Sequence, residues 1–350
     1  MNPDVIIAGG GIIGLSLALE LRRAGASVVV FDRGEPGHEA SHAAAGMLAA
    51  SDADLHPALR PLAMAAAEMY ASFVDQLELL SGLQAGFSRP GVLYVAEEDE
   101  PISSCALSPE QVRQLEPALA RESGVHLLEE ACVDPRLLTQ AAIAAAKRSG
   151  VAVHHDSRVE AVKLDDQHQP LVTTQRGTHN TGIFVNCCGA WAGEVAGAAV
   201  PARPRKGQML SVVAPECRLG HVVRSREVYL VPRKDGRILI GATVEDVGFD
   251  KQVDPDTIQH LHQAAANLVP SIGEGRILEA WAGLRPGSPD DLPIMGAGRL
   301  PGTFVSTAHF RNGILLAPIS ALLMGQFIQG KKPDLEIQQF SASRFREDGR

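Results

Sequence analysis

Residues 4–34 read DVIIAGGGIIGLSLALELRRAGASVVVFDRG, and this stretch decides the fold. The apolar run at residues 5–7 is typical of a buried strand, and apolar residues at helical spacing follow over residues 15–23 until Gly25. A second apolar strand, residues 27–31, ends at Asp32. The order of these segments predicts a strand–helix–strand unit at the start of an α/β fold.

Three glycines between the first strand and the helix fit the spacing G-x-G-x-x-G. Gly9 permits a tight turn, Gly11 lets the backbone approach a pyrophosphate, and Gly14 lets the helix and strand pack closely. The helix N-terminus adds free N–H groups and the positive end of its dipole. Asp32 can accept hydrogen bonds from the hydroxyls of an adenosine ribose. The unit therefore predicts a dinucleotide site, since a glycine-rich turn in an ordinary α/β domain would not explain the acid.

The segment after this unit distinguishes between dinucleotides. A nicotinamide dehydrogenase would continue with further strand–helix units, but residues 33–51 are mostly Gly, Ala, Ser and His with little regular pattern. Small side chains let the backbone approach a large flat ligand, so this segment is a candidate to lie along an isoalloxazine and its ribityl chain. A surface loop is the alternative interpretation.

The size and charge of the chain exclude several classes of protein. Its 350 residues exceed one ordinary core, so we expect two interlocked domains. The net charge of −9 argues against nucleic acid or an anionic membrane as the main partner. The five cysteines form no CxxC or metal-ligand spacing, so we expect no metal site. An odd number of cysteines without a signal peptide indicates reduced thiols and a cytoplasmic protein.

Neither the N-terminus nor the longest uncharged stretch predicts membrane insertion. Only MNP precedes the first strand, so we expect no targeting peptide. Residues 313–328 carry no charge, but they fall short of the ~20 residues that span a bilayer and contain Pro318. We interpret them as a turn followed by a buried helix.

Hydrophobic spacing and capping signals predict three further helices. They are expected at residues 61–80, from Ser108 and Pro109 onward, and over residues 133–150. The last of these has Asp134 as its cap, Pro135 in its first turn and Gly150 at its end.

The strand patterns fall into two groups. Residues 151–164 and 182–191 predict strands that return the chain to the first sheet. Residues 207–213, 228–243 and 276–286 are typical of an antiparallel sheet, with a turn at 234–236. We therefore expect a second domain inserted between pieces of the first.

Several motifs together resemble the glycine oxidase branch of the D-amino-acid oxidase family. Besides the N-terminal fingerprint they are SHAAAGML (41–48), VYLVPRKDGRILIGAT (228–243), AWAGLRPGSPDDLPIMG (280–296) and HFRNGILLAP (309–318). The resemblance implies an α/β fold: a Rossmann-like FAD-binding domain of the glutathione-reductase type with an inserted antiparallel-sheet substrate domain. The implied boundaries are 1–80, 134–200 and 286–350 for FAD binding, and 81–133 and 201–285 for substrate binding.

The resemblance also implies which residues contact FAD. They are Gly9, Gly11, Ile12, Ile13 and Gly14 at the pyrophosphate, Asp32 and Arg33 at the ribose, Ser41, Ala45, Gly46 and Met47 over the flavin, Val159 at the adenine, Gly189, and His309, Phe310, Arg311, Asn312, Gly313, Ile314 and Leu315 along the flavin ring. The family usually has glutamate at position 32, and a shorter acid can still accept the bond. Related sarcosine oxidases tether the flavin through a C-terminal cysteine. No cysteine follows Cys217, so we expect noncovalent FAD.

The substrate site follows from the same resemblance. Tyr229 and Arg285 match the pair that holds the substrate carboxylate. Arg311 lies in an otherwise apolar segment, where an unpaired charge would be too costly to bury. We expect it beside the carboxylate and Arg285, with the helix after Pro318 directing its positive end toward the flavin. Glu227 and Val244, also expected near the substrate, differ from the residues of characterised glycine oxidases.

The activity that the resemblance implies is oxidation of glycine or a similar small amino acid to the imine and 2-oxo acid. Oxygen is reduced to hydrogen peroxide, and the product serves thiamine (thiazole) biosynthesis. An amino-acid dehydrogenase, a sarcosine or D-amino-acid oxidase with another substrate or acceptor, and a non-catalytic FAD-binding subunit are the alternatives. The family further implies a homotetramer.

Overall fold

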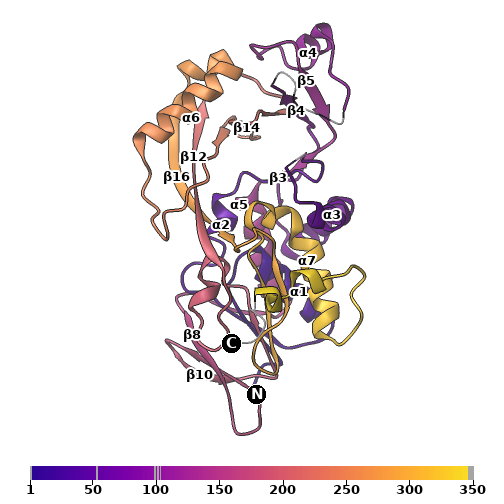
Figure 1. Ribbon diagram of the computed structural model, residues 1–350, viewed down its shortest axis with the longest axis vertical. Helices are drawn as coiled ribbons and strands as arrows, with labels where there is room; N and C mark the ends of the chain where they lie inside the picture. Colours follow the sequence, from indigo (N-terminus) through magenta and orange to yellow (C-terminus); the bar gives the residue numbers. More distant parts are fainter. Residues whose placement is uncertain (1, 53, 98–99, 101, 103, 346–350) are drawn as a thin grey trace.

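The computed structural model describes residues 2–52, 54–97, 100, 102 and 104–345 (Figure 1). Its first sheet has the strand order β17-β18-β11-β1-β2-β7. All neighbouring strands in it are parallel except β17 and β18. The strands are β1 (Val5–Ala8), β2 (Val28–Phe31), β7 (Ala152–His154), β11 (Ile183–Asn186), β17 (Ile294–Ala297) and β18 (Thr303–Thr307). The expected strand–helix–strand unit is therefore at the centre of a mostly parallel sheet.

Four helices pack together to form the largest core of the molecule. They are α1 (Ile12–Arg23), α3 (Arg60–Ser81), α5 (Pro135–Arg148) and α7 (Gly313–Ile328). The predictions for residues 61–80 and 133–150 are confirmed, and the Asp134 side chain accepts from the N–H groups of Arg136 and Leu137 as the expected cap. Apolar residues of α1 such as Leu15 and Leu17 are almost completely buried.

Pro318 lies inside α7 and not ahead of it, which corrects the sequence interpretation. Proline has no N–H, so the carbonyl four residues earlier, on Ile314, loses its helical donor. The buried hydroxyl of Tyr70 on α3 donates to this carbonyl over 3.1 Å. This contact compensates for the missing bond, and the helix begins at Gly313 and not after Pro318 as expected.

One described helical stretch, Phe310–Ile328, is long and apolar enough to cross a membrane by length and composition. Sixty-one per cent of it is buried inside the protein. Since α7 packs against both α1 and α3, its apolar character is explained by the core.

The second large sheet has the strand order β16-β12-β15-β14-β13-β4-β5. Its strands are β4 (Val92–Val95), β5 (Val125–Leu128), β12 (Arg203–Val213), β13 (Val222–Arg224), β14 (Tyr229–Pro232), β15 (Ile238–Gly241) and β16 (Arg276–Gly287). Helix α6 (Pro255–Leu268) packs against β12 and β15. Helix α4 (Pro109–Leu115) begins at the predicted cap Ser108, which forms a capping box with Gln111. The sheet is not purely antiparallel as expected, because β13 and β4 are parallel. Figure 1 shows this sheet above α1 and α7.

Two smaller sheets complete the fold. Strands β8 (Val159–Leu164), β9 (Pro170–Thr174) and β10 (Gly177–Asn180) form an antiparallel sheet of their own. Residues 159–164 therefore do not return to the first sheet as predicted; only 152–154 do, because a bend after His154 redirects the chain. The short strands β3 (Met47–Leu48) and β6 (Ala131–Cys132) pair with each other, and the short helix α2 (Ala40–Ala43) precedes β3.

Candidate active site

A cavity is lined by residues of both large sheets and of the loops between them. It gathers 20 of the 22 predicted site residues, all except Gly14 and Leu315. These are Gly9, Gly11, Ile12, Ile13, Asp32, Arg33, Ser41, Ala45, Gly46, Met47, Val159, Gly189, Tyr229, Arg285, His309, Phe310, Arg311, Asn312, Gly313 and Ile314. Residues up to 305 positions apart in the chain, from Gly9 to Ile314, thus face one space.

The two predicted residues that do not line the cavity, Gly14 and Leu315, instead serve the packing of the protein. A Cβ on Gly14 would lie 2.0 Å from the carbonyl oxygen of Gly9, so this glycine allows α1 to sit against the turn after β1. Gly9 has a φ of +104°, and a Cβ there would lie 2.2 Å from the carbonyl oxygen of Cys187. Leu315 is buried in the helical core. We therefore correct the expectation that Gly14 and Leu315 face the cofactor.

Asp32 at the end of β2 both lines the cavity and holds the glycine-rich turn. Its two carboxylate oxygens accept from the N–H groups of Gly10 over 2.7 Å and Gly34 over 3.0 Å. Burial raises the pKa of Asp32, and these backbone donors oppose the shift. A carboxylate has about four acceptor positions, so Asp32 retains capacity for ribose hydroxyls.

The start of α1 provides the second half of this end of the cavity. Gly11 caps the helix without any side-chain hydrogen bond, and the Ile12 N–H donates to the Ser41 hydroxyl over 3.0 Å. Uncapped N–H groups at a helix start favour an anion. Together with Asp32, they fit the adenosine diphosphate part of a dinucleotide.

The opposite end of the cavity carries Tyr229, Arg285 and Arg311. Burial raises the pKa of Tyr229, and the guanidinium groups of Arg285 and Arg311 oppose the shift. Burial lowers the pKa of Arg285, the neighbouring Tyr229 opposes this, and the positive charge of Arg311 adds to it. The Arg285 Nη1 donates to the carbonyl of Thr243 over 2.9 Å. These influences place two cations and a phenol close together.

Neither of these arginines forms a direct ion pair with another described residue, although the charge of Glu245 acts on Arg285 from a longer distance. Among the described residues, no carboxylate lies within ion-pair distance of Arg285 or Arg311. Arg311 is exposed in the structure, and its expected partner is the carboxylate of the substrate. Two neighbouring cations without a direct ion-pair partner among the described residues favour an anionic ligand, and a guanidinium fork matches a carboxylate.

The loop that carries Arg311 is held in an unusual conformation. Ala308 and Phe310 have φ angles of 58° and 47°, in the left-handed region that non-glycine residues rarely adopt. Between them the buried His309 places its Nε2 2.9 Å from the hydroxyl of Ser320 on α7. Burial lowers the pKa of His309 to about 3, so the imidazole is neutral. This contact ties the loop to the core helix.

Sequence reasoning missed several residues of the cavity, including Gly207, Trp191 and Arg224. Gly207 lies inside strand β12 between a basic and a more apolar segment, and a glycine inside a strand often marks a close approach. This signal was available. Nothing in the sequence separates Arg224 from a surface arginine, because its burial depends on two distant acids.

Arg224 on β13 lies directly opposite Tyr229 on β14. Its Nη1 lies 3.6 Å from Asp52 and 3.5 Å from Glu130. Burial raises the pKa of Glu130, and Arg224 opposes the shift.

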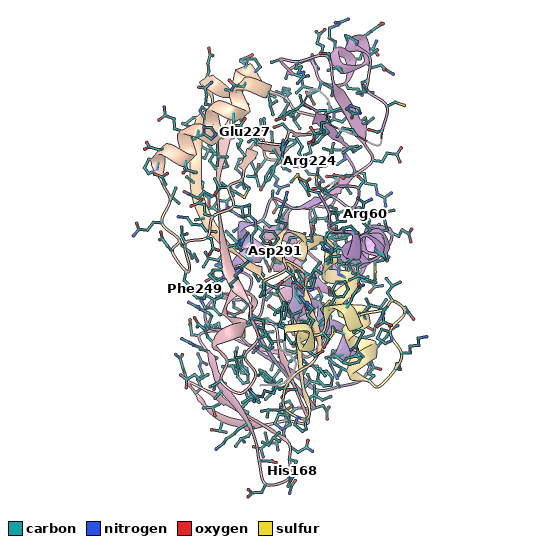
Figure 2. The ribbon with its side chains drawn as sticks, in the orientation of Figure 1. Arg60, His168, Arg224, Glu227, Phe249 and Asp291 are labelled. Atoms are coloured by element: carbon teal, nitrogen blue, oxygen red, sulfur yellow. The ribbon has the colours of Figure 1, made fainter. Side chains whose placement is uncertain are left out.

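Figure 2 shows Arg224 and Glu227 in the half of the molecule that contains the seven-stranded sheet. Of the two divergent positions, Glu227 lines the cavity, whereas Val244 is 48% exposed and lies outside the lining.

Comparisons with known proteins agree with this geometry. The family model described as FAD dependent oxidoreductase (DAO) matches residues 4–327. The chain is 37% identical to the bifunctional protein ThiO/ThiG of Trichormus variabilis, over 99% of this chain and 55% of that protein. It therefore spans about half the length of the bifunctional relatives that it matches.

A second group of relatives has the same length as this chain. The glycine oxidase of Geobacillus kaustophilus is 31% identical over 97% of both chains. A crystal structure of glycine oxidase from that organism superposes with a TM-score of 0.92 at 30% identity, over 99% of this chain and all of the other. The expected fold class and the resemblance to glycine oxidases are confirmed. The chain belongs to the DAO family of FAD dependent oxidoreductases, and its cofactor is FAD.

Proposed function

We propose that this chain is an oxidase that deaminates glycine or a similar small amino acid, with O2 as acceptor and hydrogen peroxide as product. The observation that carries the proposal is the pair of arginines, Arg285 and Arg311, that lines the cavity with Tyr229 and has no direct ion-pair partner among the described residues. An amino acid brings a carboxylate to such a site, whereas a simple amine does not.

The protein's own part in the reaction is to bind and orient the substrate. The Arg285 guanidinium binds the carboxylate, and the Tyr229 hydroxyl donates a further hydrogen bond to it. The anchored carboxylate fixes the direction of the α-carbon, and such fixed geometry supplies much of the rate enhancement of an enzyme. We assign this role to the substrate-binding part, residues 81–133 and 201–285.

The redox chemistry belongs to the cofactor. When bound, FAD would supply the acceptor for the hydride of the substrate α-carbon and the route by which its electrons reach oxygen. The substrate amine must be neutral, because its lone pair assists loss of the hydride; no side-chain base is assigned. The start of α7 at Gly313 lines the cavity, and a helix N-terminus favours negative charge there.

For the cellular role we propose thiamine (thiazole) biosynthesis in the cytoplasm. The similarity to proteins named ThiO/ThiG and glycine oxidase supports the proposed pathway. We further propose that FAD is bound noncovalently, since none of residues 218–350 is a cysteine, and that the chain assembles as a homotetramer.

Anaerobic titration of the yellow holoenzyme tests the activity. Glycine, sarcosine and D-alanine are added separately while the flavin absorbance is recorded, and air is then admitted while oxygen consumption is measured. Bleaching by glycine followed by oxygen uptake supports the oxidase. Bleaching without oxygen uptake would identify a dehydrogenase, and bleaching by sarcosine or D-alanine but not glycine would change the substrate. An unbleached flavin with all three would contradict the proposal.

A further inference from the structure

We infer that the connection between β15 and α6 retains FAD by holding one wall of the adenosine end of the cavity. Residues 246–251 of this connection are called the strap below. It leaves the seven-stranded sheet and reaches toward the other half of the molecule; Figure 2 shows Phe249 near the middle of the molecule, well below Glu227. The inference rests on the FAD cofactor alone and not on the substrate.

The base of the strap is fixed to β12. Asp250 lies 3.8 Å from the Nζ of Lys206, whose side chain is only 4% exposed. Asp246 lies 3.7 Å from Nη1 of Arg205. The strap therefore has anchors on the strand beside it, and its tip has a defined position.

The tip contacts an aromatic residue that lines the cavity. The Phe249 ring stacks on Trp191, with ring centroids 5.5 Å apart and an interplanar angle of 26°. The Arg33 guanidinium lies 4.2 Å from the centre of the same indole. Trp191 and Arg33 both line the cavity, and Phe249 does not. Phe249 is therefore a positioning residue that acts on the cavity through Trp191.

A charged contact also attaches the strap to the wall of the cavity. The Lys251 Nζ lies 2.8 Å from Glu39, which lines the cavity and whose charge influences Asp32. Lys251 itself lies outside the lining. The strap thus holds two lining groups, Trp191 and Glu39, on the wall around Asp32 and Arg33.

Release of FAD requires this wall to yield, so loosening the strap should speed release. The Phe249→Ala variant loses one aromatic pair, for which we expect FAD to dissociate about 2- to 10-fold faster. Lys251→Ala loses an exposed ion pair, for which we expect at most an about 5-fold change at low salt. Salt screens exposed pairs, so the Lys251 effect should disappear at high ionic strength while the Phe249 effect remains.

The experiment measures FAD release from the holoenzyme. Each protein is diluted to nanomolar concentration, and free FAD is measured by fluorescence in filtrates at successive times, at low and high NaCl. The matched control is Val247→Ala, an apolar truncation in the same strap at a residue that is 46% exposed, outside the lining and without a contact to Trp191. Phe249→Trp restores an aromatic ring and should restore slow release.

The control variants distinguish a specific effect of Phe249 on FAD release from a general loosening of the fold. Faster release in Phe249→Ala with wild-type rates in Val247→Ala and Phe249→Trp supports the inference. Wild-type release from Phe249→Ala overturns it, and so does equal acceleration in Val247→Ala, because the effect would then be one of loop stability. Neither result alters the proposed amino-acid oxidation, which the titration with glycine tests separately.

Discussion

The guanidinium of Arg285 occupies the space that a side chain at Gly207 would fill. A Cβ at position 207 would lie 2.2 Å from Nη1 and 2.5 Å from Cζ of Arg285. The neighbouring strands β12 and β16 pair Gly207 with Gly283 and Arg205 with Arg285, so the arginine crosses its partner strand exactly where no Cβ is present. The absence of a side chain on one strand therefore decides where the cation on the next strand points.

Gly207→Ala should impair the enzyme without unfolding it. The clashing atoms are the far end of a flexible side chain, so the guanidinium should move and the strands should remain paired. We expect kcat/KM for glycine to fall at least about tenfold, which corresponds to about 1.4 kcal/mol, with little change in melting temperature. Gly273→Ala is the control, since its nearest neighbour would be an ordinary 3.5 Å contact. Unchanged kinetics in Gly207→Ala would mean that Arg285 does not hold the carboxylate.

Arg285→Ala should remove carboxylate recognition and spare the cofactor. Loss of one partner of a buried charge pair costs about 2–5 kcal/mol, so kcat/KM for glycine should fall about thirty-fold to several thousand-fold. The FAD content should stay near the wild-type value. A carboxylate-free amine such as benzylamine, if it is a substrate, should lose much less. For Arg311→Ala we expect lower glycine turnover together with a change in the flavin spectrum, because we propose that the loop carrying Arg311 lies along the flavin ring. Near-normal glycine oxidation by Arg285→Ala would show that another group binds the carboxylate.

Asp32→Ala should weaken FAD binding. A hydrogen bond to a charged group contributes about 1.5–3 kcal/mol, so the dissociation constant should rise about 10- to 150-fold. The matched control is Asp165→Ala, because Asp165 also accepts two backbone N–H bonds, from Gln167 and Gln169, but lies outside the cavity. Acid precipitation of the wild-type holoenzyme should release all FAD into the supernatant. Tight FAD retention at submicromolar Asp32→Ala would refute the ribose contact, and colour in the acid pellet would refute noncovalent binding.

The buried His309 should make folding stability sensitive to acid. Its pKa is about 3 in the folded protein, against about 6.5 in an unfolded chain, so only the unfolded state takes up a proton between these values. The free energy of unfolding is therefore unaffected by His309 above about pH 6.5 and decreases as the pH falls from 6.5 toward 3. At pH 5 this decrease is about 2 kcal/mol. His309→Gln, which retains a polar group toward Ser320, should reduce the difference in unfolding free energy between pH 7 and pH 5 by this amount. Urea titrations with saturating FAD measure it, with the exposed His168→Gln (Figure 2) as control. An unchanged pH difference in His309→Gln would contradict the assignment.

Tyr70→Phe should destabilise the protein through the proline in α7. The variant leaves the Ile314 carbonyl buried without a donor, which costs about 1–3 kcal/mol. Urea denaturation provides the measurement. Pro318→Ala supplies the missing helical N–H, so the same Tyr70→Phe change should cost less in that background. A double-mutant cycle therefore isolates the interaction, and an equal cost in both backgrounds would show that the two residues are independent.

The nucleotide-binding unit was predictable because its determinants are close together in the sequence. The glycines at 9, 11 and 14, the amphipathic helix and Asp32 act within about 30 residues, and each has a local steric or hydrogen-bonding reason. The helices at 61–80 and 133–150 were predictable for the same reason, since spacing and caps are local. Residues 159–164 were assigned to the wrong sheet because their strand pattern is correct for either sheet, and only the bend after His154 decides between them.

Local patterns in the sequence therefore predict the nucleotide-binding unit, the main helices and the family to which the motifs belong. The tertiary structure alone decided which distant side chains meet. Whether Pro318 interrupts α7 depends on the Tyr70 hydroxyl, 248 positions earlier in the chain. Arg285 can reach the cavity because Gly207, on the paired strand β12, has no side chain. In the arrangement that we infer, Trp191 is held in place by Phe249, which lies in the connection between β15 and α6. Such contacts are set by strand register and by packing between elements. Register and packing depend on the whole chain, because surfaces from distant parts of the sequence must be complementary before they can be buried against each other.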